Sequence, residues 1–167
     1  MAAKPVRPQP VSDQKIQNQL KVLAIYQLTG GVLGIVLTLW VMFRGELVVT
    51  QEVLRIALFA AALYVFSMLC GRMLFRNLKR GLTLSILNQV LQVVYVAFGS
   101  DAFQYVAGLR VGVGFDMVGS WTLKFRLAVS SFQFLIGTDT GQRFIGVNLL
   151  ALLLIFWMER LLERVRG

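Results

Sequence analysis

Four polar side chains lie at helical spacing in the uncharged stretch 81–100, GLTLSILNQVLQVVYVAFGS. They are Ser85, Asn88, Gln92 and Tyr95, at spacings of three, four and three residues. This spacing places them on one face of a helix. Amide and hydroxyl groups facing lipid would lack hydrogen-bond partners, so we predict that the face points into a helix bundle. Two kinds of chemistry fit: hydrogen bonding between helices, or a polar path for a solute. Asn148, in a later apolar stretch, is the predicted partner of Gln92 or Asn88.

The chain offers few groups for catalysis. It has no histidine and one cysteine, Cys70, which excludes an intramolecular disulfide, zinc sites built from Cys/His clusters and histidine-dependent triads. Cys70 ends an apolar run and is interpreted as a small core residue. None of the eight acidic residues lies in the middle of an apolar stretch. We therefore predict no enzyme activity, no metal site and no cofactor.

The composition indicates a membrane protein. Of the 167 residues, 57% are hydrophobic, compared with roughly 45–50% in soluble domains. In a soluble protein the net charge of +9 would suggest nucleic acid, but here the basic residues cluster at the ends of apolar stretches, which argues against it. One cluster contains Arg72, Arg76, Lys79 and Arg80. We interpret it as a topology determinant, or alternatively as a contact for anionic lipid headgroups.

Four apolar stretches predict four transmembrane helices, at residues 22–43, 54–75, 81–100 and 143–160. The first is too long for the core of a signal peptide. It contains Gly30 and Gly34 in a GxxxG motif, a spacing that lets another helix approach closely, either within the chain or in an oligomer. The second and fourth are short and are expected to cross with basic side chains reaching out to the interface.

Between the third and fourth of these stretches, the pattern changes to the period of a strand. Alternate residues from Phe103 to Phe115 and from Trp121 to Val129 are apolar, with a turn signal at 118–120. Opposed residues of an antiparallel pair share a face, so the predicted register places Val113 opposite Phe125. At Ser130 the alternation shifts, which fits either a bulge in one long strand or a tight turn into a third strand.

The predicted fold is therefore a mainly α membrane protein of four transmembrane helices, with an extracytoplasmic β-hairpin or meander (102–137) inserted between helices three and four. Residues 1–11 hold all three prolines and are expected to form a flexible arm. Residues 12–160 are expected to form a single membrane domain, followed by a tail over 161–167. Basic residues number 11 on the side of the two termini and 6 on the other, so both termini are predicted to be cytoplasmic.

The stretches YQLTGGVLGIVLTLW and LNQVLQVV resemble those of small polytopic, four-helix membrane proteins of bacteria. The resemblance implies a multi-pass protein of the bacterial inner membrane, and it implies no particular activity. We expect a structural or interaction subunit of a bacterial envelope assembly, since the alternating hairpin offers an apolar face and free edges. The alternative is a permeation path or ligand site along the polar stripe. The expected partners are the lipid bilayer and a protein partner or second copy, bound through the β segment or the GxxxG face.

Overall fold

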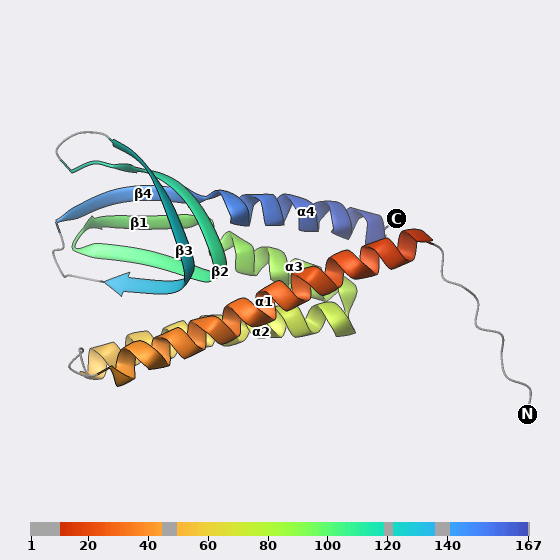
Figure 1. Cartoon of the computed structure of the whole chain (residues 1–167), viewed down its shortest axis with the longest axis horizontal. Coiled ribbons are helices and arrows are strands. Elements are labelled where there is room, and N and C mark those ends of the chain that lie inside the picture. Colours follow the sequence, from red (N-terminus) through yellow and green to blue (C-terminus); the bar gives the residue numbers. More distant parts are fainter. Residues whose placement is uncertain (1–10, 45–49, 119–121, 136–140, 167) are drawn as a thin grey trace, which may run out of the picture.

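The computed structural model describes residues 11–44, 50–118, 122–135 and 141–166. Helices α1 (Val11–Phe43) and α2 (Gln51–Arg76) form a long antiparallel hairpin. The shorter helices α3 (Leu78–Val90) and α4 (Leu149–Arg166) lie beside the half of this hairpin nearest the chain termini (Figure 1). A β-sheet lies beside the other half, so each of these two short helices continues directly toward the sheet.

The prediction of four transmembrane helices is wrong. Among the described residues, two helical segments are long and apolar enough to cross a membrane, Gln14–Phe43 and Gln51–Arg76. The stretch 81–100 divides into α3 and strand β1 (Val94–Gly99), and the stretch 143–160 divides into strand β4 (Gln142–Asn148) and α4. Absence of charge does not distinguish one spanning helix from a short helix joined to a strand. The valines and aromatic residues of VVYVAFG, residues 93–99, favour the strand.

The described residues form four helices and one sheet of four antiparallel strands, in the order β1–β4–β2–β3. Strand β1 also pairs with the first part of β2 (Asp101–Asp116). The predicted hairpin is formed by β2 and β3 (Thr122–Leu135), but it is part of a larger sheet to which both supposed transmembrane stretches contribute a strand. The mainly α, four-span architecture is therefore replaced by a mixed one.

The predicted register of the hairpin is confirmed. Val113 lies opposite Phe125, and the neighbouring apolar pairs follow in step. Strand β3 is continuous, so the tight turn into a third strand is wrong, and the register shift lies between Val106 and Leu109 of β2, opposite Ser130. Residues 119–121, which include most of the predicted turn, lie outside the described residues.

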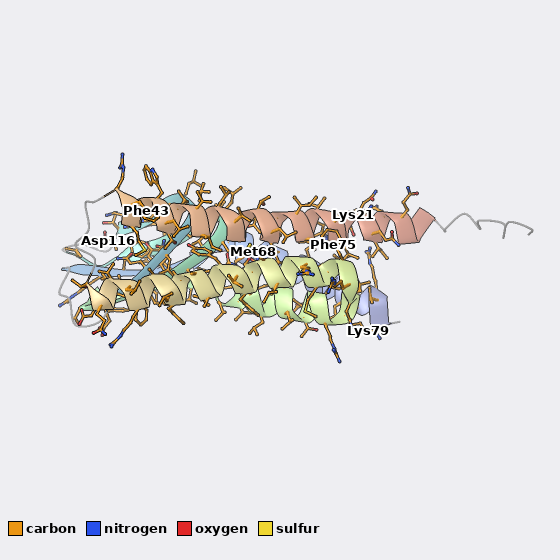
Figure 2. The ribbon with its side chains drawn as sticks, turned by 90° about the horizontal axis from the view of Figure 1, so that it is seen from below. Lys21, Phe43, Met68, Phe75, Lys79 and Asp116 are labelled. Carbon is orange, nitrogen blue, oxygen red and sulfur yellow. The ribbon has the colours of Figure 1, made fainter. Side chains whose placement is uncertain are left out.

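The structure buries several polar side chains beside its apolar core clusters and leaves many large apolar side chains exposed. The buried polar residues are Gln27, Ser67, Ser85, Asn88, Gln89, Gln92, Arg110, Ser130 and Asn148. Large apolar side chains are exposed on α1, α2, α4 and the outward face of the hairpin, where Leu127 is 83% exposed. Figure 2 places Lys21 and Lys79 near one end of the long axis, and Phe43 and Asp116 near the other.

Candidate functional site

Asn88 connects two helices and the sheet through a buried set of hydrogen bonds. Its Nδ2 donates to the Ser67 hydroxyl of α2 at 3.2 Å, and its Oδ1 lies 3.0 Å from the Tyr105 hydroxyl of β2. That hydroxyl is also 2.8 Å from the carbonyl oxygen of Leu63, so its single proton is shared between two acceptors. The Asn88 side chain therefore holds α2, α3 and β2 in one arrangement.

The same network extends to α1 and to the bend in β2, by which we mean the register shift between Val106 and Leu109. The Ser67 hydroxyl donates to the Gln27 carbonyl at 3.2 Å, and the Ser85 hydroxyl donates to Gln27 Oε1 at 3.3 Å. Gln92 Nε2 donates to the Asn88 carbonyl at 3.2 Å, and Gln92 Oε1 accepts from the Ala107 N–H at 2.9 Å. Most of these polar groups are hydrogen-bonded to one another, as buried amides and hydroxyls require, whereas the Nε2 of Gln27 has no partner among the described residues.

The structure brings together three of the five residues predicted to share a polar interior. Ser85, Asn88 and Gln92 belong to the network, whereas Tyr95 lies on β1, because the helix ends at Val90 and the helical spacing no longer applies. Asn148, the predicted partner of Gln92 or Asn88, instead accepts at Oδ1 from the Val111 N–H at 3.3 Å. Two members of the network, Gln27 and Ser67, are polar residues within apolar stretches, and that isolation was the signal for them in the sequence.

The two glycines of the GxxxG motif are both used within the chain. A β-carbon on Gly30 would lie 2.6 Å from the backbone nitrogen of Gly108, so α1 contacts the bend of β2. A β-carbon on Gly34 would overlap the ring of Tyr64 on α2. The absent side chains thus let α1 approach the sheet and α2 closely.

The basic residues Arg72, Arg76, Lys79 and Arg80 are exposed where α2 ends and α3 begins. They lie at the end of the molecule that also carries Lys21 of α1 (Figure 2). This end is therefore strongly basic.

A second site, absent from the sequence predictions, lies on one face of the sheet. We call it the arginine–aromatic cluster: Tyr95, Arg110, Arg126 and Phe144. The rings of Tyr95 and Phe144 are stacked, with centroids 4.5 Å apart and planes inclined by 18°. The guanidinium carbon of Arg110 lies 4.6 Å from the Tyr95 centroid, and that of Arg126 lies 4.4 Å from the Phe144 centroid. Both are cation–π distances.

The electrostatics of this cluster are dominated by burial and positive charge. Burial raises the pKa of Tyr95, so the phenol is neutral and can donate a hydrogen bond. Burial lowers the pKa of Arg110, which nevertheless stays a cation because an arginine titrates so far above neutrality. Asp116, on the same strand, accepts from the Lys124 ammonium, which lowers its pKa. The cluster was missed because its two aromatic residues come from stretches predicted to be helical.

Among the described residues, no group of three or more histidine, cysteine, aspartate or glutamate side chains is placed to hold a metal ion. Comparison of the chain with protein-family models, with curated proteins and with solved structures gave no match. The features of the molecule that bear on function are the network, the cluster and the distribution of apolar surface.

Proposed function

We propose that the protein is a membrane-associated structural or interaction subunit, in which the α1–α2 hairpin crosses the bilayer and lipid covers the exposed apolar side chains. The observation that carries this proposal is the large exposed apolar surface, which occurs together with buried polar side chains. Amides, hydroxyls and a guanidinium are buried, while leucine, valine and phenylalanine side chains are exposed along the hairpin. Water-soluble proteins rarely expose continuous apolar surface on this scale, whereas lipid solvates it without cost.

The length of the apolar zone supports the same placement. Residues 22–43 of α1 carry no charge, and 22 residues at about 1.5 Å each span roughly 33 Å, close to the hydrocarbon thickness of a bilayer at about 30 Å. Lys21 precedes the zone and Arg44 follows it. Within it, Val22 is 58% exposed and Val36 is 54% exposed. In α2, Leu58 is 62% exposed within the uncharged run between Arg55 and Arg72.

The sheet supports a role in interaction. Leu123, Phe125, Leu127 and Val129 of β3 are all exposed, whereas Gly112 and Gly114 of β2 are buried on the opposite face. Strand β3 pairs with β2 along one edge, and among the described residues no strand pairs with its other edge. Backbone groups facing hydrocarbon need partners. We therefore place the protein partner, or a second copy, at this edge of β3.

The two ends of the molecule suggest an orientation. The N-terminal end of α1, the α2–α3 elbow and the C-terminal end of α4 all lie at one end of the long axis (Figure 1). Lys15, Lys21, Arg160 and Arg164 add to the basic residues of the elbow at that end. By the positive-inside rule this end is cytoplasmic in our proposal, in an inner-membrane location.

A permeation path along the polar stripe remains a prediction. Hydrogen bonding within the chain accounts for the buried polar side chains without such a path. Ser85, Asn88 and Gln92 each bond to another buried group. A cavity of about 230 Å³ lies between α1, α2 and β3, but its walls are mostly apolar and these three residues do not line it. Liposome flux of small solutes would test the path directly.

Membrane partitioning tests the proposed placement. We expect the expressed protein to sediment with membranes and to resist extraction by alkaline carbonate. We also expect brominated lipid to quench Trp40, which is 52% exposed on α1, in a variant with Trp121→Phe and Trp157→Phe. Introducing charge with Val32→Lys and Val36→Lys should release the protein, whereas the matched surface change Lys79→Gln should not. Recovery of the unmodified chain as a monodisperse protein in the aqueous fraction would refute the placement.

A further inference from the structure

The arginine–aromatic cluster holds two guanidinium groups and no carboxylate. Arg110 is only 5% exposed, and its Nε and Nη1 atoms have no hydrogen-bond partner among the described residues. The hydroxyl of Tyr95, a residue that is 6% exposed, also has none. A guanidinium removed from water without an acceptor is strongly unfavourable, so buried arginines normally face an anion or several carbonyl oxygens. Three buried donors in one cluster therefore point to an acceptor that the described part of the chain does not provide.

The hydrogen bonds of the neighbouring carboxylate go to donors outside the cluster. Asp116 pairs with the Lys124 ammonium and also accepts from the Val118 N–H at 3.1 Å. Among the described residues, the charged side chains that act on Tyr95 are Arg110, Arg126 and Asp116, and Asp116 is paired with Lys124. This excess of positive charge favours a ligand that carries negative charge itself.

The two guanidinium groups are placed to act on one ligand. Both lie beside the ring of Tyr95, with guanidinium carbons 4.6 and 5.8 Å from its centroid. Arg110 is buried and Arg126 is exposed, so together they connect the interior of the sheet with its surface. The Arg110 side chain lies over Gly112, with its Nε atom 3.4 Å from the position that a β-carbon would occupy there.

We propose that Arg110, Arg126 and the Tyr95 hydroxyl bind a phosphate group, carried by an anionic lipid or present as the free ion. Phosphate oxygens are the acceptors that arginine recognises best, and two guanidinium groups match the charge of one phosphate. The aromatic pair fixes the direction of both side chains before the ligand arrives. This binding site is independent of the membrane placement proposed above, since it rests on unpaired donors inside the sheet.

The test uses the full chain in an uncharged detergent, with the Arg110 Nε–H resonance as a local reporter in nitrogen-15 NMR, assigned by its absence in Arg110→Lys. The probes are inorganic phosphate, with sodium chloride of equal ionic strength as the blank, and bicelles with or without phosphatidylglycerol. We expect saturable shifts of the Arg110 signal. The apparent dissociation constant should rise by about tenfold in Arg126→Gln and by less in Tyr95→Phe. The exposed Arg80→Gln should leave it unchanged.

The outcomes separate the source of the phosphate from the failure of the proposal. A response to inorganic phosphate supports a site for the free ion, and a response to phosphatidylglycerol alone supports a lipid headgroup. No response to either probe, or a response that Arg126→Gln leaves intact, would overturn the site. The site would also be overturned if Arg110→Leu is as stable as the unmodified chain and the probes still shift its unfolding temperature. If Arg110→Leu does not fold, Arg126→Gln and Tyr95→Phe still decide the question.

Discussion

The Ser130 hydroxyl on β3 donates to the Gly30 carbonyl in the middle of α1, at 3.0 Å and across 100 residues of sequence. The same oxygen accepts from the Gly108 N–H of β2 at 2.9 Å. Gly108 lies at the register shift of the hairpin and has a φ of +110°, which favours glycine. The bulge leaves its N–H without a partner in the ladder, and Ser130 supplies one. The buried Ser130 hydroxyl thus connects the bend of the sheet to α1 through two hydrogen bonds.

Replacing Ser130 by alanine should therefore destabilise the protein. The change leaves the buried N–H of Gly108 without an acceptor, which costs about 1–3 kcal/mol. Thermal unfolding followed by circular dichroism in detergent would measure it. The adjacent Ser131→Ala is the matched control, because Ser131 accepts from a part-buried glutamine, Gln104, away from the helices. An equal or larger loss in the control would show that Ser130 does not join sheet and helix as described.

The close approach of α1 and β2 predicts a sharp difference between two glycines. Gly30→Ala places a methyl group 2.6 Å from the Gly108 nitrogen, a backbone atom, and we expect a loss of about 1–3 kcal/mol. Gly112→Ala meets its nearest atoms at 3.4 Å, one of them the Nε of the Arg110 side chain, and should be tolerated better. Comparing the unfolding midpoints of the two variants tests the contact. Equal midpoints would mean that α1 lies farther from the sheet.

The polar network predicts opposite behaviour for two neighbouring glutamines. Gln92→Leu removes the acceptor of the buried Ala107 N–H and should cost about 1–3 kcal/mol. The Nε2 of Gln89 is buried without a partner, so Gln89→Leu should be nearly neutral or stabilising. Unfolding midpoints measured side by side decide between these outcomes. A neutral Gln92→Leu would show that the network contributes little to stability.

Tyr105 predicts a loss of stability at alkaline pH. Burial raises the pKa of its phenol above the ordinary value, so the folded state favours the neutral form. Its contribution is therefore complete below pH of about 10, where the unfolded phenol begins to ionise, and is lost as the pH rises further. Unfolding midpoints would be measured at intervals of about half a pH unit between about pH 8 and 11. They should fall less steeply in Tyr105→Phe than in the unmodified chain. Parallel curves would contradict this role.

The sequence allowed the hairpin to be predicted because its alternation is strict. A slip of one residue would turn Val113 and Phe125 to opposite faces, so the pattern determines the register. The shift of the alternation at Ser130 was informative as well, although the extra residue of the bulge lies across the ladder on β2. The same alternation does not reveal which face is inside, because that depends on whether water or lipid surrounds the sheet.

Two failures have a common physical cause. The stretches 81–100 and 143–160 are uncharged or nearly so, and an apolar helix and a buried strand are equally compatible with that composition. Once Tyr95 and Phe144 had been placed in helices, their contact with each other and with Arg110 could not be foreseen. Pairing between β1 and β4 joins residues about fifty positions apart, and such non-local contacts leave no periodic signal in either segment.

Spin-label accessibility in phosphatidylcholine vesicles shows whether lipid covers the apolar exterior. Single cysteines at Leu127, Val36 and Lys79, in a Cys70→Ala background, would carry the label. Our account predicts that labels at Leu127 and Val36 collide readily with lipid-soluble oxygen and poorly with a water-soluble nickel chelate, and that a label at Lys79 shows the reverse. A label at Leu127 that is as accessible to nickel as the one at Lys79, or shielded from both reagents, would contradict it.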